Sequence, residues 1–140
     1  VYSILRQKLY DVILEAQDAG IGIVARTALE SGFLSGNYRP GHVFTQPDHR
    51  ARWVEANLEF ILGKTRDIGK LVNAPYENIP QMATKFTLAN PSVSTLILGA
   101  RNSDQVIRNM KTEILPPLPE ETLNVLKQTY GYITERCNTK

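Results

Sequence analysis

"STLILGARNSDQVIRNM", residues 94–110, is the most informative stretch for the fold, because within it a short apolar run ends at Gly99 and passes directly into an amphipathic segment. A run of this length and composition is typical of a strand, and the spacing of the apolar residues that follow is helical. Asn102 is a favourable N-cap, and Gln105, three residues later, could complete a capping box. The stretch therefore predicts a strand followed at once by a helix over residues 102–112, the repeating unit of α/β proteins.

The start of this helix also favours an anion site. The free N–H groups of a helix N-terminus carry a partial positive charge of roughly half an electron, and Arg101 stands beside them. Gln105 and Asn109 are four residues apart and share a helix face that Arg108 adjoins. An arginine with two amides suits a phosphate attached to a hydrogen-bonding base, such as the adenosine 2′-phosphate of NADP. A capped surface helix without a ligand is the commoner alternative, and these residues alone leave it open.

A second stretch, "ARTALESGFLSGNY" at residues 25–38, follows another short apolar run. Gly32 and Gly36, with the small residues Ser31 and Ser35, would let backbone amides approach a pyrophosphate closely. A flexible surface loop is the alternative. Both stretches begin where a predicted parallel strand ends, and barrel enzymes build their sites at the carboxyl ends of their strands. The two stretches are therefore expected to contribute to one site.

The rest of the chain alternates apolar runs with helical patterns, which predicts parallel βαβ units. The runs at 21–25 and 94–99 suit strands buried on both faces, and Asp48 is expected to cap the helical stripe after it. The expected elements are a strand end at 1–5, helices at 7–19, 49–72 (with a break near Gly63), 78–89 and 120–136, and the two strands. Two strands and a fragment are too few to close a barrel. A typical (β/α)₈ barrel also needs roughly 250 residues. The pattern indicates about half of one.

The composition excludes several classes of partner. The 140 residues carry a net charge of +2 without a basic stripe, which argues against nucleic acid. No apolar run approaches the roughly 20 residues that span a bilayer, so no membrane is expected. The single Cys137 gives no reason for an oxidising compartment, so a cytoplasmic location is predicted. His42 and His49 lack partners at ligand spacing, so no metal site is predicted.

The two stretches together resemble the C-terminal half of the aldo-keto reductases. The family has a segment like Ser-Pro-Leu-x-x-Gly-x-Leu-x-Gly-Lys-Tyr after its seventh strand, and residues 27–38 read TALESGFLSGNY. Its eighth strand runs into Gly-Ala-Arg/Ser-x-x-x-Gln-x-x-x-Asn, and here Gly99, Ala100, Arg101, Gln105 and Asn109 match that pattern. The resemblance implies an α/β fold: the C-terminal part of a TIM (β/α)₈ barrel, about strands six to eight with their helices and a C-terminal helix. Residues 1–140 would form a single unit, with the N-terminal half of the barrel absent.

The resemblance also implies that NADP(H) lies across the mouth of the barrel. Its pyrophosphate would lie under the loop at 27–36, and its adenosine phosphate would meet the start of the last barrel helix. Because one amide oxygen cannot serve both tasks well, Gln105 is assigned to the cofactor and the helix cap to Asn102. The expected cofactor-binding residues are Arg26, Thr27, Leu29, Gly32, Leu34, Gly99, Arg101, Gln105, Arg108 and Asn109.

Four positions depart from the family pattern. Arg26 stands where an aromatic residue often stacks on the nicotinamide, and a guanidinium could stack there instead. Ala28 replaces proline, and Asn37 replaces a lysine that adds charge on the pyrophosphate side. Arg108 replaces a common acidic residue, which would favour a phosphate over a free ribose.

No catalytic residue is assigned in this chain. In the family, the nicotinamide transfers a hydride to a carbonyl while a tyrosine, tuned by a lysine and an aspartate, acts as general acid beside a histidine, and all four residues lie in the first half of the barrel. The six tyrosines here are better explained by packing. The first hypothesis is the cofactor-binding half of an NADP-dependent oxidoreductase, with a small-molecule carbonyl substrate if an N-terminal half is supplied. The alternatives are a non-catalytic nucleotide-binding or interaction module, which could self-associate through open sheet edges, and an inactive truncated product.

Overall fold

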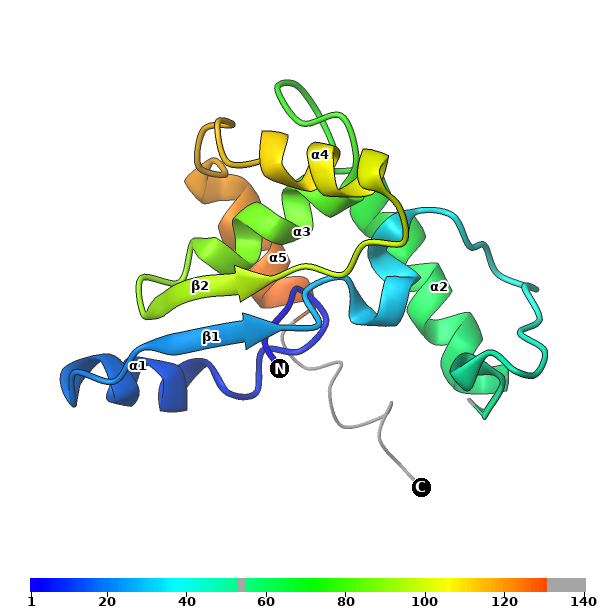
Figure 1. Ribbon diagram of the computed structural model, residues 1–140, viewed down its shortest axis with the longest axis horizontal. Coiled ribbons are helices and arrows are strands. Elements are labelled where there is room, and N and C mark those ends of the chain that lie inside the picture. Colours follow the sequence, from blue (N-terminus) through cyan, green and yellow to red (C-terminus); the bar gives the residue numbers. More distant parts are fainter. Residues whose placement is uncertain (53–54, 131–140) are drawn as a thin grey trace.

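A two-stranded parallel sheet, formed by β1 (Ile23–Arg26) and β2 (Val93–Ile97), lies at the centre of the chain (Figure 1). The structure is a computed structural model and describes residues 1–52 and 55–130. The helices are α1 (Tyr10–Asp18), α2 (Glu55–Gly69), α3 (Ile79–Leu88), α4 (Ser103–Lys111) and α5 (Glu120–Tyr130), with two 3₁₀ helices, η1 (Glu30–Ser35) and η2 (His49–Arg52). The predicted alternation of strands and helices is confirmed. The predicted end of the last helix at Arg136, and Cys137, lie outside the described residues.

The sheet differs from the prediction in two ways. Residues 1–5 are not a strand: Ser3 and Arg6 form an isolated bridge, and Tyr2, Ile4 and Leu5 are buried in the core. The strands are also not buried on both faces, because helices cover only one face of the sheet. Val24 and Ile97, on the other face, are 57% and 63% exposed.

Helix α3 begins at Ile79, close to the predicted start at 78, and Asn78 caps it. Asn78 has an extended backbone, and its side-chain oxygen accepts the Gln81 N–H at 3.0 Å. The helix then buries one face, including Met82 and Phe86, and packs against β2. Local capping and a packed apolar face thus both support this helix.

The predicted break near Gly63 was wrong, because α2 runs unbroken from Glu55 to Gly69. Glycine lowers helix stability by about 1 kcal/mol relative to alanine. That cost is offset here by burial of Leu58, Ile61, Leu62 and Ile68 on the same helix.

The core joins segments from the two ends of the chain. Tyr2 stacks on Phe86 of α3 with ring centroids 5.9 Å apart, and Leu126 of α5 is fully buried. Phe33 and Leu34, both in η1, are also fully buried. Burial of these two side chains anchors the segment after β1, and this segment borders the cleft described below. Within the described ranges, no helix is long and apolar enough to cross a membrane.

Candidate functional site

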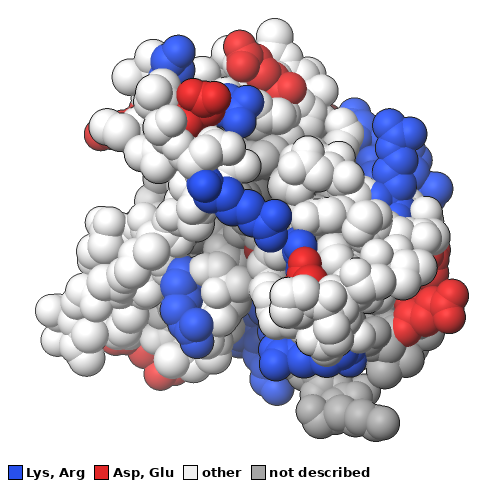
Figure 2. Space-filling view, turned by 45° about the vertical axis from the view of Figure 1, so that its right-hand side comes forward, with Lys and Arg blue, Asp and Glu red and all other residues white. Residues whose placement is uncertain are grey.

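A cleft with a volume of about 550 Å³ lies where the segments following β1 and β2 meet the start of α3. Figure 2 shows a hollowed face of the molecule with Lys and Arg side chains around the hollow. The structure thus brings together the two stretches that the sequence indicated. Eight predicted site residues line the cleft, namely Thr27, Leu29, Gly32, Gly99, Arg101, Gln105, Arg108 and Asn109.

Arg26 and Leu34, the other two predicted residues, are not among the lining residues. Arg26 is the last residue of β1 and its side chain is exposed. Leu34 is fully buried in the core, and its N–H donates to the Leu29 carbonyl oxygen at 3.2 Å. Because both its side chain and its amide are already used, Leu34 supports the cleft from behind.

The start of α4 is ordered by three side-chain hydrogen bonds. Asn102 accepts the Gln105 N–H at 3.0 Å, which confirms the predicted cap. The Gln105 side-chain oxygen accepts the Arg101 N–H at 2.7 Å. The Asn109 amide donates to the Gly99 carbonyl oxygen at 3.5 Å. The expectation that Gln105 takes no part in capping was therefore wrong, and only its NH₂ group stays outside that hydrogen bond.

The arginines of this region differ from the amides in exposure. Arg101 and Arg108 are exposed, whereas Gln105 and Asn109 are half-buried against the loop that follows β2. Both arginines line the cleft, Arg101 beside the N-terminus of α4 and Arg108 in its last turn. Positive charge at a helix start that is already partly positive suits an anionic group.

The turn after β1 is closed by its own backbone. The Leu29 carbonyl oxygen accepts the N–H groups of both Gly32 and Leu34, at 2.9 and 3.2 Å. The Gly32 amide is therefore engaged within the turn, and the approach of backbone amides in this stretch to a pyrophosphate stays a prediction. Gly32 has φ +89, and a Cβ there would lie 3.2 Å from Nη1 of Arg50, so the absence of a side chain serves close packing with arginine.

Arg50 is the functional candidate that sequence reasoning missed. Its side chain is 2% exposed, although it lines the cleft, and it pairs with Asp48 at 2.6 Å. Its guanidinium also donates to the Ser31 carbonyl oxygen at 3.2 Å and lies 4.6 and 4.3 Å from the ring centroids of Tyr38 and Phe44. Arg50 thus ties the segment 38–50 to the turn after β1.

Asp48 does two things at once. Its Oδ1 accepts the backbone N–H of Arg50 at 2.9 Å, so it caps η2 as the sequence predicted for the helix start. Hydrogen bonds from the Arg50 side chain and backbone hold the pKa of the Asp48 carboxyl well below its usual range. The same pairing raises the pKa of Arg50. The sequence signal was an aspartate two residues before an arginine in a loop with aromatic residues, and it was read only as a cap.

The start of α3 forms the remaining wall, and it was also missed. Asn78, Pro80 and Gln81 line the cleft. The Gln81 side-chain oxygen accepts the Glu77 N–H at 2.7 Å, while Asn78 accepts the N–H of Gln81. This reciprocal capping holds the helix start in place beside the cleft.

The structure gives two tyrosines a packing role. Tyr2 is buried, and its burial raises the pKa of its hydroxyl to about 12. Tyr76 donates to the Pro116 carbonyl oxygen at 2.7 Å, and burial raises its pKa as well. Among the described residues, no group of three His, Cys, Asp or Glu side chains is placed to hold a metal ion.

Comparison with known proteins gives consistent matches. The model of the aldo/keto reductase family matches residues 1–130. A putative voltage-gated potassium channel subunit beta of Schizosaccharomyces pombe is 29% identical over 131 residues, which cover 87% of this chain and 38% of that protein. An uncharacterized oxidoreductase of Bacillus subtilis, YrpG, is 29% identical over 130 residues, covering 92% of this chain and 38% of that protein.

Solved structures show the same fold. The glycerol dehydrogenase AKR11B4 from Gluconobacter oxydans matches with a TM-score of 0.79 at 20% identity, covering 99% of this chain and 44% of that one. The holo form of the aldo-keto reductase AKR11C1 from Bacillus halodurans matches with a TM-score of 0.65 at 19% identity, with the same coverage of both chains. This chain therefore spans less than half the length of the proteins that it matches.

Proposed function

This chain belongs to the aldo/keto reductase family, and from that premise we propose that it is the C-terminal, cofactor-binding part of an NADP-dependent oxidoreductase. It would correspond to about strands six to eight of a (β/α)₈ barrel. The carrying observation is the cleft, in which the segments after two parallel strands meet beside exposed arginines. Its volume of about 550 Å³ lies within the range of about 300 to 1,000 Å³ that is usual for small-molecule sites.

The adenosine end of the cofactor fits the start of α4. Arg101 is an exposed cation just before the N-terminus of α4, Arg108 is an exposed cation in its last turn, and a guanidinium can bind a phosphate through two hydrogen bonds. The Gln105 NH₂ group and the Asn109 side chain lie on the same helix face and would meet the adenosine. Arg101 would contact the 2′-phosphate, which distinguishes NADP from NAD.

The pyrophosphate end fits the turn after β1. Thr27, Ser31, Ser35 and Asn37 line this part of the cleft, and their hydroxyl and amide groups would bind the pyrophosphate; Arg50, paired with Asp48, lines the same part. These groups would take the place of the backbone amide of Gly32, which is bonded within the turn. The role predicted for Arg26, beside the nicotinamide, stays a prediction.

NADP(H), when bound, supplies a hydride for reduction of a carbonyl or accepts one from an alcohol. The residues of this chain would bind and orient the nucleotide. The groups that protonate the substrate would come from the N-terminal half of the barrel, outside residues 1–140, as the family resemblance implies. A small-molecule carbonyl is the proposed substrate class.

The test is a titration of the chain with NADPH, followed by nicotinamide fluorescence, with folding verified by circular dichroism. Arg101→Ala should lower the affinity for NADPH at least about tenfold more than the affinity for NADH, because a bidentate charged contact to the 2′-phosphate is lost. Arg66→Ala, at an exposed arginine on α2, is the matched control and should change neither affinity. Equal losses for both cofactors would mean that Arg101 does not contact the 2′-phosphate. A folded chain that shows no fluorescence change up to millimolar NADPH would contradict the proposal.

A second candidate is nucleotide binding without prominent turnover. The observation that favours it is the similarity to proteins named as potassium channel beta subunits, at 25 to 29% identity. Carbonyl-dependent oxidation of NADPH, measured with an N-terminal half supplied, separates the two candidates: NADPH binding without reduction of any carbonyl tested supports the second. An inactive truncated product, the third alternative, predicts neither binding nor turnover.

A further inference from the structure

The turn between β1 and η1 holds an unusual backbone conformation. Thr27, Glu30 and Ser31 have φ values of +63, +48 and +54, in the left-handed region that non-glycine residues seldom adopt. For Thr27 this is a clear exception, because a branched Cβ crowds the backbone there. Such conformations persist only where surrounding contacts impose them, and they concentrate at ligand-binding sites.

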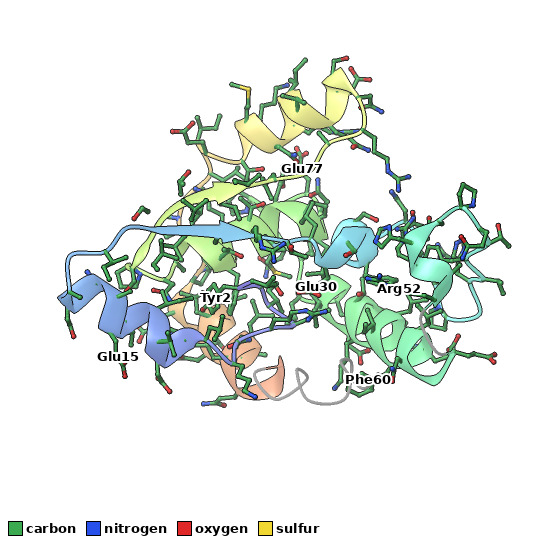
Figure 3. The ribbon with its side chains drawn as sticks, turned by 60° about the horizontal axis from the view of Figure 1, so that its bottom comes forward. Tyr2, Glu15, Glu30, Arg52, Phe60 and Glu77 are labelled. Atoms are coloured by element: carbon green, nitrogen blue, oxygen red, sulfur yellow. The ribbon has the colours of Figure 1, made fainter. Side chains whose placement is uncertain are left out.

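One of these contacts is the side chain of Glu30. The carboxylate is 3% exposed, yet both of its oxygens are bonded: Ser3 Oγ donates to one at 2.5 Å, and Arg6 Nε donates to the other at 2.8 Å. Figure 3 shows Glu30 between η1 and the N-terminal segment that also carries Tyr2. A buried carboxylate with both oxygens bonded is held firmly, because leaving either interaction unmade is costly.

Arg50 also contacts the turn: its Nη1 donates to the Ser31 carbonyl oxygen at 3.2 Å. Thr27, Ser31 and Gly32 line the cleft, whereas the Glu30 carboxylate is directed away from it, toward Ser3 and Arg6. Glu30 therefore cannot bind a ligand in the cleft directly. It can act on a ligand only through the shape of the turn.

We propose that Glu30 is a positioning residue: anchored by Ser3 and Arg6, it holds the strained turn in the shape that binds the pyrophosphate of the dinucleotide. This inference rests on the proposed function, because it assigns the pyrophosphate to this turn. It also assigns a role to the segment 1–6, which would support the cofactor site without touching the cofactor.

The test compares two ligands in the full chain. NADPH would contact both the turn and the start of α4, whereas adenosine 2′-phosphate lacks a pyrophosphate and would contact only α4. Glu30→Gln keeps the size of the side chain but removes its charge and one acceptor. We expect Glu30→Gln to lower the affinity for NADPH about tenfold, the loss usual for a charge-assisted hydrogen bond. The affinity for adenosine 2′-phosphate should stay unchanged. Glu15→Gln, at an exposed position on α1, is the matched control and should change neither affinity.

Hydrogen exchange gives a second readout that does not depend on a ligand. The amides of Gly32 and Leu34 close the turn by bonding to Leu29, so their exchange should accelerate in Glu30→Gln while the amides of α3 are unchanged. If Glu30→Gln does not fold, Ser3→Ala removes one contact and keeps the ion pair with Arg6, and the same local acceleration is expected.

The outcomes separate this inference from the proposed function. Two outcomes refute the role of Glu30 but leave the proposed cofactor site intact. Either Glu30→Gln weakens the binding of both ligands equally, or it leaves the affinity for NADPH the same as that of the unmodified chain. If the unmodified chain binds neither ligand, the proposed function fails. Exchange then decides alone: acceleration confined to the turn supports the anchoring role of Glu30, and unchanged exchange refutes it.

Discussion

Arg50 shows how one side chain joins segments that are distant in the sequence. Its charge is almost wholly removed from water, and the structure compensates for this with the Asp48 carboxylate, the Ser31 carbonyl and two aromatic rings. An arginine suits this place better than a lysine, because its planar group donates in several directions and stacks on rings. A buried charge of this kind makes the surrounding loop sensitive to loss of its partner.

The Asp48–Arg50 pair predicts a specific acid sensitivity. Because Arg50 lowers the pKa of Asp48 in the folded chain, the pair contributes its full stabilisation above the ordinary aspartate pKa of about 4 and loses it as the pH falls below that value. Asp48→Asn lacks this contribution. Its thermal midpoint should be lower than that of the unmodified chain at pH 7, and the difference should shrink between about pH 4 and pH 2.

Thermal melts across this pH range measure the effect. Asp67→Asn is the control, because Asp67 pairs with Lys70 at an exposed position where solvent screens the charges. The control should lower the midpoint less at every pH. Parallel curves for Asp48→Asn and the unmodified chain would show that the pair does not contribute.

At the scale of elements, α4 is the least embedded helix. None of its residues is buried, and Val106, Ile107 and Met110 are 46%, 51% and 68% exposed. Helix α3, in contrast, buries most of one face. The position of α4, and with it the placement of Arg101, therefore depends strongly on the hydrogen bonds at its start.

This contrast predicts different effects for the same substitution at two caps. Asn102→Ala should cost α4 about 1 kcal/mol, the usual value of an N-cap, and should appear as faster amide exchange within α4. Asn78→Ala removes the corresponding cap of α3, and because that helix is part of the core it should lower the thermal midpoint of the whole chain. An equal drop in midpoint for both variants would contradict the view that α4 is held locally.

The elements also show which features a sequence can reveal. The starts of α3 and α4 were predicted correctly, because helical spacing, joined at α4 by the cap residue Asn102, acts over a few positions. The burial of β1 and β2 was predicted wrongly, since apolar composition at Val24 and Ile97 does not say whether a partner covers them. Residues 1–5 read as a strand because they are apolar, and their burial arises instead from contacts with α3 such as that of Tyr2.

The same limit applies to the site. Arg101, Gln105 and Asn109 stand at helical spacing, so their common location was predictable, and eight predicted residues do line one cleft. Arg50 was missed because its partners Ser31, Tyr38 and Phe44 are brought to it only by the fold. The use of the Gly32 amide within its own turn was equally hidden, since a glycine-rich stretch does not reveal its hydrogen bonds.

At the scale of the whole molecule, the sheet has only two strands in the described residues and leaves both of its edges unpaired. Within the described ranges, β1 and β2 pair only with each other, so each has an outer edge without a neighbouring strand. One face exposes Val24 and Ile97. Unpaired strand edges beside apolar surface favour association with other strands.

We therefore expect the isolated chain to self-associate, with a mass that rises with concentration in light scattering. Val24→Lys should reduce the association, because it places a charge on the exposed face of the sheet. Val43→Lys is the control, since Val43 is 77% exposed in a loop away from the sheet. A stable, compact monomer at all concentrations would contradict this expectation.

The parallel pairing of β1 with β2 also sets an order of events during synthesis. Ile23 and Ser94, which are hydrogen-bonded to each other, are 71 residues apart in the chain. On the ribosome, β1 therefore emerges long before its partner exists, while α1, α2 and α3 can each begin to form from local contacts. Pairings this distant form slowly, so the sheet is completed only after β2 has been released. The cleft, whose two walls follow these strands, exists only from that moment.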